Sequence, residues 1–289
     1  MTQTLLFQGL VGLSGAMSLW LVSAGLTLIF GVLRVLNFAH GALYMLGAYL
    51  ALTVVTSFHQ DFWTALVVAA LGVAVVGVAV ERLFLRPVYR LPVAYQLLLT
   101  FAFVLIFDDL VKIVWGAIYQ VPPMPAGLGG TVIVLGRAFP VYHLFIMVAG
   151  GAVAVGLWAL FDLSLWGKLV RAAACDPEMA AAVGINVPWL FTEVFAFGAA
   201  LAALGGALTV PVQTVSPGMG EGIIIDAFIV VVIGGLGNLW GAFVGALLIG
   251  LLHAYGTLFV PVFDLALAFI LMAMVLIWRP AGLFGGQTT

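Results

Sequence analysis

Charged side chains are scarce in this sequence. Only 7% of its 289 residues are Asp, Glu, Lys or Arg, whereas charged residues make up about 25% of a typical soluble domain. Hydrophobic residues account for 65% of the chain, and the mean hydropathy is +1.30. A chain of this composition cannot cover its surface with groups that favour water, so we expect a polytopic membrane protein.

Other absences exclude further classes of function. The single cysteine, Cys175, rules out an internal disulfide. The net charge is −2, and no basic block is present that would bind nucleic acid. The only Gly-Lys pair, Gly167-Lys168, precedes Leu169 rather than Ser or Thr, so the chain lacks a phosphate-binding loop. Any ATP energy must therefore come from another chain, and we expect no cofactor on this one.

Metal binding and catalysis have equally little support. His40 has no second ligand at the spacing of a metal site, and the other three histidines are isolated. No Ser/His/Asp pattern indicates a nucleophile. We therefore expect neither a metal site nor an enzyme. The first residues also lack the basic region of a cleavable signal peptide, so we expect the first helix to be retained.

Long apolar runs fill most of the chain. A membrane-spanning helix needs about 20 apolar residues, and the uncharged runs of suitable length are Leu5–Leu33, Gly41–Phe58, Phe62–Val80, Ala138–Phe161, Val194–Val212 and Ala227–Phe263. Leu91–Gly116 also qualifies if Asp108, Asp109 and Lys112 are tolerated. The last uncharged run, with 37 residues, is too long for one crossing and must hold two helices or a broken one. We expect eight to ten membrane elements, all helical, in a single transmembrane domain over residues 1–289.

The cationic residues predict the orientation of the chain. Most of them gather in three places, represented by Arg86, Arg171 and Arg279. By the positive-inside rule these segments face the cytoplasm. The loop 163–187 is then cytoplasmic, and the Pro- and Gly-rich loop 120–140 is extracytoplasmic.

Polar residues interrupt the first apolar region between Arg34 and Gly41. Such groups are costly inside a membrane unless they meet partners or water, so the cluster is a functional hypothesis by default. Arg34, Asn37 and His40 recur at a spacing of three and would share one face if this stretch were helical. We favour a structural role, in which they cap a broken helix, over direct contact with a substrate.

A second interruption lies 200 residues further along the chain. Windows 29–52 and 229–252 match at six of 24 positions and share one layout, an apolar run, a break, Gly-Ala and another apolar run. Paired interrupted segments are typical of transport pathways built from repeats, although in so apolar a chain chance explains six matches equally well. The residues assigned to the two breaks are Arg34, Asn37, His40 and Gly41, and Gly234, Gly235, Gly237 and Asn238. The number of crossings between residues 209 and 241 stays open.

A short helix is predicted in the loop 163–187. Asp176 suits the N-cap, Pro177 suits the first helical position, and Glu178 complements the positive end of the helix dipole. Gly184 fits a left-handed C-terminal cap. So short a helix is marginal alone, so we interpret it as a coupling helix that seats in a cytoplasmic subunit; the alternative is a connector on the lipid surface. The residues assigned to coupling are Arg171, Asp176, Pro177, Glu178, Ala181 and Gly184.

Ionisable residues occur at a few other places in the apolar runs. Asp108 and Lys112 are spaced i, i+4 and are predicted to form an ion pair on one helix face. Asp109, Glu193 and Asp226 also lie in or beside apolar runs. We interpret them as structural or interfacial groups in preference to a proton or ion relay.

Taken together, these motifs resemble the inner-membrane permease subunits of branched-chain amino-acid ABC importers, of the LivH type. The resemblance lies in GLTLIFGVLRVLNFAHG at 25–41, in RAAACDPEMAAAVGINV at 171–187, and in the segments 216–220 and 227–238. It extends over nearly the whole chain. The family often has Glu where Asp108 stands here, which is a conservative departure.

The resemblance implies a set of partners in a bacterial inner membrane. They are a LivM-like permease, two cytoplasmic ATP-binding subunits, a periplasmic substrate-binding protein and membrane lipid. In such importers the binding protein largely sets selectivity, so branched-chain or other hydrophobic amino acids are the leading substrates, and urea, amides or aromatic acids come second. A stand-alone secondary transporter or channel is an alternative of a different class, in which Asp108, Asp109 or Asp226 would be essential.

Overall fold

The computed structural model describes residues 2–134 and 136–285. Its main helices are α1 (Thr2–Leu33), α2 (Ala39–Thr56), α3 (Phe62–Val80), α5 (Val93–Trp115), α6 (Val141–Trp158), α7 (Leu165–Cys175), α8 (Pro177–Ala182), α9 (Val187–Thr209), α10 (Met219–Gly234), α11 (Leu239–Phe259) and α12 (Asp264–Trp278). Short segments complete them: the π-helical η1 (Glu81–Leu85) and η2 (Ala159–Leu163), α4 (Arg86–Val88) and the 3₁₀ turn η3 (Pro261–Phe263).

Seven helical segments in the described residues are long and apolar enough to cross a membrane. They contain α1, α2, α3, α6, α9, α11 and α12. The 23-residue α5, which carries three charged residues, and the 16-residue α10 lie in the same bundle. The long run that begins at Ala227 is divided after Gly234, as the sequence predicts. The expected all-helical architecture with eight to ten membrane elements is therefore confirmed.

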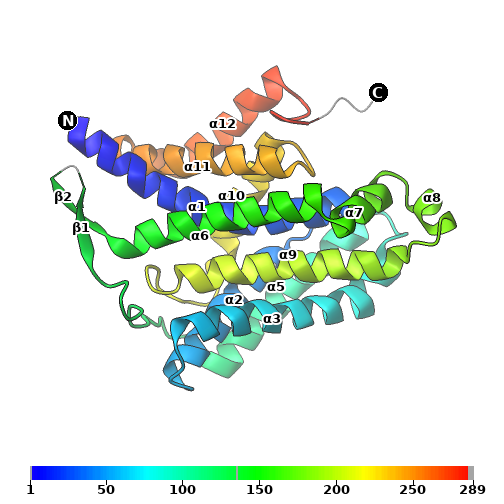
Figure 1. Ribbon diagram of the computed structural model, residues 1–289, viewed down its shortest axis with the longest axis horizontal. Coiled ribbons are helices and arrows are strands. Elements are labelled where there is room, and N and C mark those ends of the chain that lie inside the picture. The colour runs from blue at the N-terminus through cyan, green and yellow to red at the C-terminus, as the bar shows by residue number, and fades with distance from the viewer. Residues whose placement is uncertain (1, 135, 286–289) are drawn as a thin grey trace.

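The bundle has two distinct ends (Figure 1). The N-terminus and a hairpin of β1 (Thr131–Val134) and β2 (Arg137–Pro140) lie at one end, hereafter the N-terminal end. Helices α7 and α8 lie at the opposite end, hereafter the α8 end. Arg86 and Arg171 both lie toward the α8 end, because Arg86 binds the first turn of α9 and Arg171 belongs to α7. The grouping of these cations at one end fits the predicted orientation.

Close packing of small residues holds the bundle together. Helix α1 runs through its centre against α9 and α11, and α9 also packs on α2 and α3. Gly25 of α1 faces Gly198 of α9 so closely that a Cβ on either would overlap the other's backbone. In a membrane, helices associate by such packing rather than by the hydrophobic effect. Large side chains fill the remaining space, among them the fully buried Tyr44 and Phe195.

Candidate functional site

Helix α2 begins inside the bundle rather than where α1 ends. His40 Nε2 lies 3.0 Å from the Val22 carbonyl oxygen, and Val22 precedes the last residue of α1 by eleven positions, or about 16 Å of helix. The chain leaves α1 through Arg34, which has a positive φ of 56°. Residues 34–38 therefore double back along α1, and α2 starts deep in the protein. Irregular backbone at such a depth is tolerated where protein or a water-filled cavity surrounds it.

The polar cluster differs in detail from the sequence prediction. Residues 34–38 are not helical, so Arg34, Asn37 and His40 do not share a helix face, and no side chain caps the N-terminus of α2. The capping prediction is wrong because the segment is drawn out along α1, and His40 binds that helix instead. Arg34 is exposed. Asn37 is fully buried, and neither its Oδ1 nor its Nδ2 is hydrogen-bonded within the described part of the chain.

The N-termini of α2 and α10 cross in direct contact. A Cβ on Gly41 would overlap the Gly220 carbonyl group, and a Cβ on Gly220 would overlap that of Gly41. Gly218, with a φ of 79°, turns the chain into α10 without a side-chain cap. Each helix N-terminus carries the positive end of a helix dipole, and part of its N–H groups is satisfied locally, since His40 N donates to Asn37 O and Glu221 N donates to Gly218 O. The crossing therefore places two positive helix ends side by side.

A cavity of about 340 Å³ borders this crossing, and we call it the crossing cavity. It is lined from α2 and its N-cap (Phe38, Ala42, Met45), from α5 (Phe101, Val104, Leu105, Asp108), and from α10 and its N-cap (Gly218, Gly220, Glu221, Ile224, Ile225, Phe228). Most of the lining is apolar. The polar features are two carboxylates and the backbone of the two helix starts.

The first of these carboxylates, Asp108, is only partly neutralised. Its Oδ2 lies 2.5 Å from Lys112 Nζ, as the i, i+4 spacing predicts, and Asp109 Oδ1 lies 3.2 Å from the same ammonium. The Oδ1 atom of Asp108 is buried and accepts no hydrogen bond from the described residues. Two carboxylates thus share one lysine, and the local net charge is negative.

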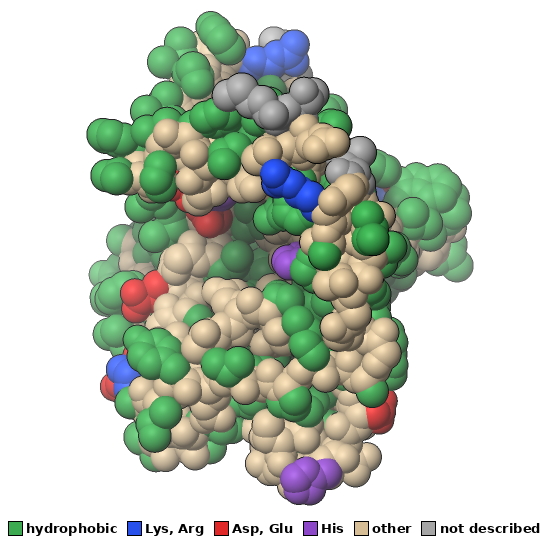
Figure 2. Space-filling model, turned by 90° about the vertical axis from the view of Figure 1, so that its left-hand side faces the viewer, with side chains coloured by type: hydrophobic (Ala, Val, Ile, Leu, Met, Phe, Trp, Pro, Cys, Tyr) green, Lys and Arg blue, Asp and Glu red, His purple; other side chains and the backbone are tan. Residues whose placement is uncertain are grey.

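The face at the N-terminal end of the molecule is hollowed at its centre (Figure 2). Acidic and histidine side chains lie around this hollow. A cluster of this chemical kind joins three helices: His253 of α11 lies 2.9 Å from Asp264 Oδ2 of α12 and 3.4 Å from Asp226 Oδ1 of α10. Asp226 therefore faces an imidazole, with which it forms an ion pair when His253 is protonated, and this contact agrees with a structural interpretation of Asp226.

The second predicted break lies at the other end of α10. Gly235 and Gly237 both have positive φ, 103° and 81°, and form a tight turn between α10 and α11. Asn238 accepts from the Gly241 N–H at 2.9 Å and so caps α11. Unlike the first break, this one does not separate its helices, because Gly234 and Gly241 are in backbone contact. The two windows share a helix–break–helix layout but use different geometries.

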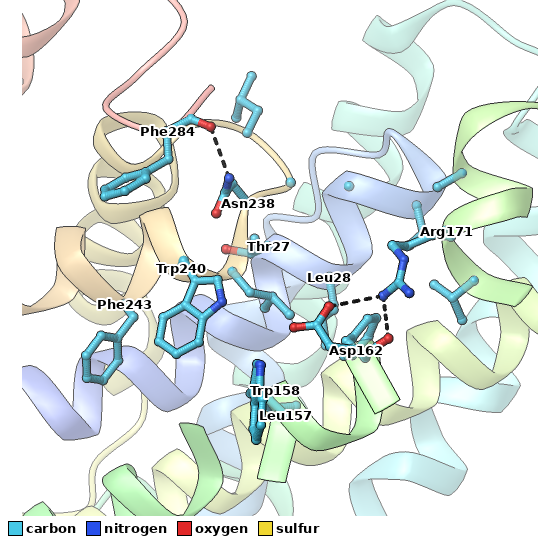
Figure 3. A pocket seen from close by; sticks show the side chains of 18 of the residues that line it. Thr27, Leu28, Leu157, Trp158, Asp162, Arg171, Asn238, Trp240, Phe243 and Phe284 are labelled. Carbon is cyan, nitrogen blue, oxygen red and sulfur yellow. Dashed lines mark hydrogen bonds and ion pairs between the residues drawn. The ribbon is translucent and has the colours of Figure 1, made fainter. Parts of the chain in front are cut away.

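A larger cavity of about 460 Å³ lies between this turn, α1, η2 and α7 (Figure 3). Gly31 of α1 and Gly237 are so close that a Cβ on either would lie within 2.9 Å of the other's Cα. Arg171 donates to the Phe161 carbonyl oxygen and lies 3.4 Å from Asp162 Oδ1 on the cavity wall. The cavity thus brings together Arg171 and the α10–α11 turn, which sequence reasoning assigned to two separate sites.

The C-terminal segment covers the α10–α11 turn. Leu283 N donates to the Ile233 carbonyl oxygen at 2.8 Å, and Phe284 N donates to that of Gly234 at 3.0 Å. Asn238 Nδ2 in turn donates to the Phe284 carbonyl oxygen at 3.0 Å. These bonds satisfy carbonyl groups at the end of α10 that have no partner within the helix.

Helix α8 has the predicted capping chemistry. Asp176 Oδ1 accepts from the Met179 N–H at 2.9 Å, Pro177 is the first helical residue, and Gly184 has a φ of 95°. Ala180 is buried against the rest of the protein, whereas Met179 and Val183 are 62% and 71% exposed. Two large apolar side chains are therefore presented at the α8 end.

A buried network that sequence reasoning missed ties η1, at the end of α3, to the first turns of α9. Glu81 is fully buried in η1, and Arg86 Nη2 lies 3.2 Å from Glu81 Oε2. The same guanidinium donates to the Pro188 carbonyl oxygen at 2.7 Å, in the first turn of α9, and Thr192 donates to Glu81 at 2.7 Å. Tyr89 also donates to Glu81, and burial raises the pKa of its hydroxyl. One feature of the sequence could have indicated this network. Glu81 and Arg86 are five residues apart, which is the hydrogen-bond spacing of a π-helical turn.

Comparison with known proteins identifies the class. Residues 10–278 match the family described as branched-chain amino acid transport system / permease component. BraD of Pseudomonas aeruginosa, a high-affinity branched-chain amino acid transport system permease protein, is 29% identical over 95% of this chain and 94% of its own length. LivH of Escherichia coli strain K12, which bears the same description, is 25% identical over 92% and 90%.

The fold also has a solved counterpart. A chain in the structure of PsaBC from Streptococcus pneumoniae in complex with Fab superposes with a TM-score of 0.50 at 12% identity, over 93% of this chain and 89% of that one. The protein is a multi-pass membrane permease. It belongs to the branched-chain amino acid transport system permease family.

Proposed function

We propose that this chain is one of two membrane-spanning subunits of an ATP-driven importer for branched-chain or other hydrophobic amino acids in a bacterial inner membrane. The observation that carries the proposal is α8, a capped helix that presents Met179 and Val183 to the surrounding medium. Exposed apolar side chains on a helix outside the bundle favour a protein partner. That partner is a cytoplasmic ATP-binding subunit, because the chain has no nucleotide-binding motif of its own.

The connections of α8 support transmission of movement into the bundle. Arg86 joins η1 at the end of α3 to the first turn of α9, and α9 packs on α1, α2 and α3. Because α8 itself contacts α7 and α9, a displacement of α8 would shift α9, and with it the part of α2 around Gly47 that packs on Ala203. The positive-inside rule favours a cytoplasmic location for the loop 163–187 and an outer location for the loop 120–140.

The remaining proposed partners would complete the transport pathway, of which this chain forms only one part. Asp109 of α5 and Glu221 of α10 are exposed, and carboxylates exposed to lipid would be costly. A second permease, similar to LivM, would cover these carboxylates and complete the pathway. A periplasmic binding protein would deliver substrate to the hollowed end of the molecule, and two ATP-binding subunits, with ATP and Mg²⁺, would act at the α8 end.

Purification from the native membrane tests the assembly. The affinity-tagged chain in mild detergent should bring down a second permease and an ATPase, and the purified complex should hydrolyse ATP. An intact complex that contains no ATP-binding subunit would overturn the proposal. The substrate is tested separately by thermal-shift screening of the binding protein. Stabilisation by leucine, isoleucine or valine supports the assignment, whereas stabilisation by urea or an aromatic acid alone replaces it.

A further inference from the structure

The larger cavity, of about 460 Å³, lies toward the α8 end of the bundle (Figure 3). Helix α1 forms its floor, α6, η2 and α7 form one wall, and the α10–α11 turn with the start of α11 forms the other. Apolar side chains such as Leu28, Leu157 and Phe243 cover much of this surface. Because Trp158 and Trp240 line the cavity and are 44% and 53% exposed, it is open to the surrounding medium.

Hydrogen-bond donors without acceptors surround this cavity. Trp158 and Trp240 project into it from opposite walls (Figure 3), and the indole N–H groups that donate within the described residues belong to other tryptophans. Trp20, in the floor, is buried, and its indole N–H also has no partner in the described part of the chain. Arg171 uses only its Nη1 group within the fold, so Nε and Nη2 can donate to a ligand. The lining therefore suits a ligand that is rich in acceptor oxygens.

We infer that this cavity binds one phospholipid with an anionic headgroup, from the leaflet at the α8 end. Arg171 suits the phosphate, since a guanidinium can donate two parallel hydrogen bonds to it. The two exposed indoles suit the ester carbonyl oxygens, because tryptophan concentrates at the level of lipid headgroups. The apolar floor along α1 suits an acyl chain. The site requires neither ATP nor a transported substrate, so it is independent of the proposed import function.

Charge favours an anionic headgroup over a zwitterionic one. Lys168 lies three residues before Arg171 on α7, so the two cations share a helix face. Asp162, at 3.4 Å from Arg171, offsets one of them. The remaining single positive charge attracts anionic lipid, as basic residues beside a membrane do. Because this charge is small, the acyl chain must supply much of the affinity.

Other occupants fit the cavity less well. An α-helix with its side chains is about 10 Å wide, so a single turn occupies about 420 Å³ and would fill the cavity. A helix of a partner subunit would therefore cover the opening without entering it. A small soluble anion would leave the apolar floor and walls uncovered. An acyl chain is narrow enough to lie along α1 between the two walls.

Lipid titration followed by native mass spectrometry tests the site. The affinity-tagged chain, purified from its native membrane with the subunits that accompany it and then washed free of lipid in detergent, should bind one phosphatidylglycerol. Binding should be about fivefold tighter than that of phosphatidylcholine with the same acyl chains, the factor expected for one net positive charge. sn-Glycerol 3-phosphate should not displace the lipid. Equal binding of the two lipids, or displacement by sn-glycerol 3-phosphate, overturns the inference.

Variants in matched pairs locate the site. Ala154→Phe fills the cavity from α6 and should abolish the tighter binding of phosphatidylglycerol, whereas Ala152→Phe, exposed on the same helix outside the cavity, should leave it unchanged. Trp240→Phe removes one indole N–H and should weaken binding about threefold. Trp63→Phe, at a tryptophan of similar exposure in α3, should have no effect.

The role of charge is tested in the same way. Arg171→Gln should make the affinities for phosphatidylglycerol and phosphatidylcholine equal, whereas Arg90→Gln, which removes an exposed cation outside the cavity, should preserve the preference. If Arg171→Gln alone lowers the melting temperature, the variants of Ala154 and Trp240 decide the question. Equal effects of the two members of each pair would show that lipid covers the surface without a defined site, and would overturn the inference.

Discussion

Gly41 of α2 and Gly220 of α10 contact each other through their backbones where the two helices begin. This contact fixes the crossing of α2 and α10, and the cavity beside it depends on that crossing. Because a Cβ on either residue would overlap a carbonyl group of the other helix, the position requires glycine on both sides.

Replacement of Gly220 tests that requirement. Gly220→Ala should destabilise the chain by about 1–3 kcal/mol, since backbone cannot move aside as a flexible side chain can. Gly222→Ala on the same helix is the matched control, because no atom lies within 4 Å of the position of its Cβ. Thermal unfolding of the purified complex measures both. Equal melting temperatures for the two variants would show that the helices do not touch at this point.

The buried Glu81 network should matter more for stability than the exposed ion pair. Arg86→Met leaves the carboxylate of Glu81 buried without its cation and should cost about 3 kcal/mol. Arg171 and Asp162 are each about half exposed, so Asp162→Asn should cost less than about 1 kcal/mol. Denaturant or thermal unfolding checks the difference. A similar small loss for both variants would mean that Glu81 reaches water or another partner.

Asn37 should be dispensable for folding and needed for transport. Its two polar side-chain atoms are buried and make no hydrogen bond within the described residues, so Asn37→Leu should leave the stability unchanged or raise it by about 1 kcal/mol. Leucine uptake should nevertheless fall, because the amide stands directly before the N-cap of α2. Melting temperature and uptake measured on one preparation decide the point. A loss of more than about 2 kcal/mol would indicate that the amide is satisfied in the assembled protein.

Two substitutions of Asp176, the N-cap residue of α8, can be compared: one removes the capping oxygen and the other keeps it. Asp176→Ala removes the acceptor for the Met179 N–H and should cost the short helix about 1 kcal/mol. Asp176→Asn keeps an N-cap oxygen and should preserve coupling. ATP hydrolysis per leucine transported is the measurement, and the ratio should rise for the alanine variant alone. Equal ratios in both variants would argue against a coupling role for the cap.

Local chemistry was predictable from the sequence, and contacts distant along the chain were not. The α8 cap and the Asp108–Lys112 pair depend on residues three or four apart, whose geometry any helix enforces. The re-entry of α2 depends on His40 meeting Val22 on another helix, which no local pattern reveals. The bond between Thr192 and Glu81 likewise joins residues more than a hundred positions apart.

The sequence also did not reveal which of the predicted site residues lie close together in the fold. The two breaks were recognisable as polar or Gly-rich interruptions, but their different geometries arise from the surrounding packing. Gly41 meets α10, whereas Gly237 meets the end of α1 at Gly31. Glu221 carried no signal of its own, because its significance comes from the cavity that three helices form around it.

ATP-dependent leucine uptake into vesicles that contain the complete complex, compared between the unmodified chain and Ala181→Pro, tests the central claim most directly. Proline at this interior position should break α8. We predict that the unmodified complex accumulates leucine only with ATP on the α8 side, and that Ala181→Pro hydrolyses ATP without accumulation. Leucine accumulation that is independent of ATP, or that is unaffected by Ala181→Pro, would contradict the account.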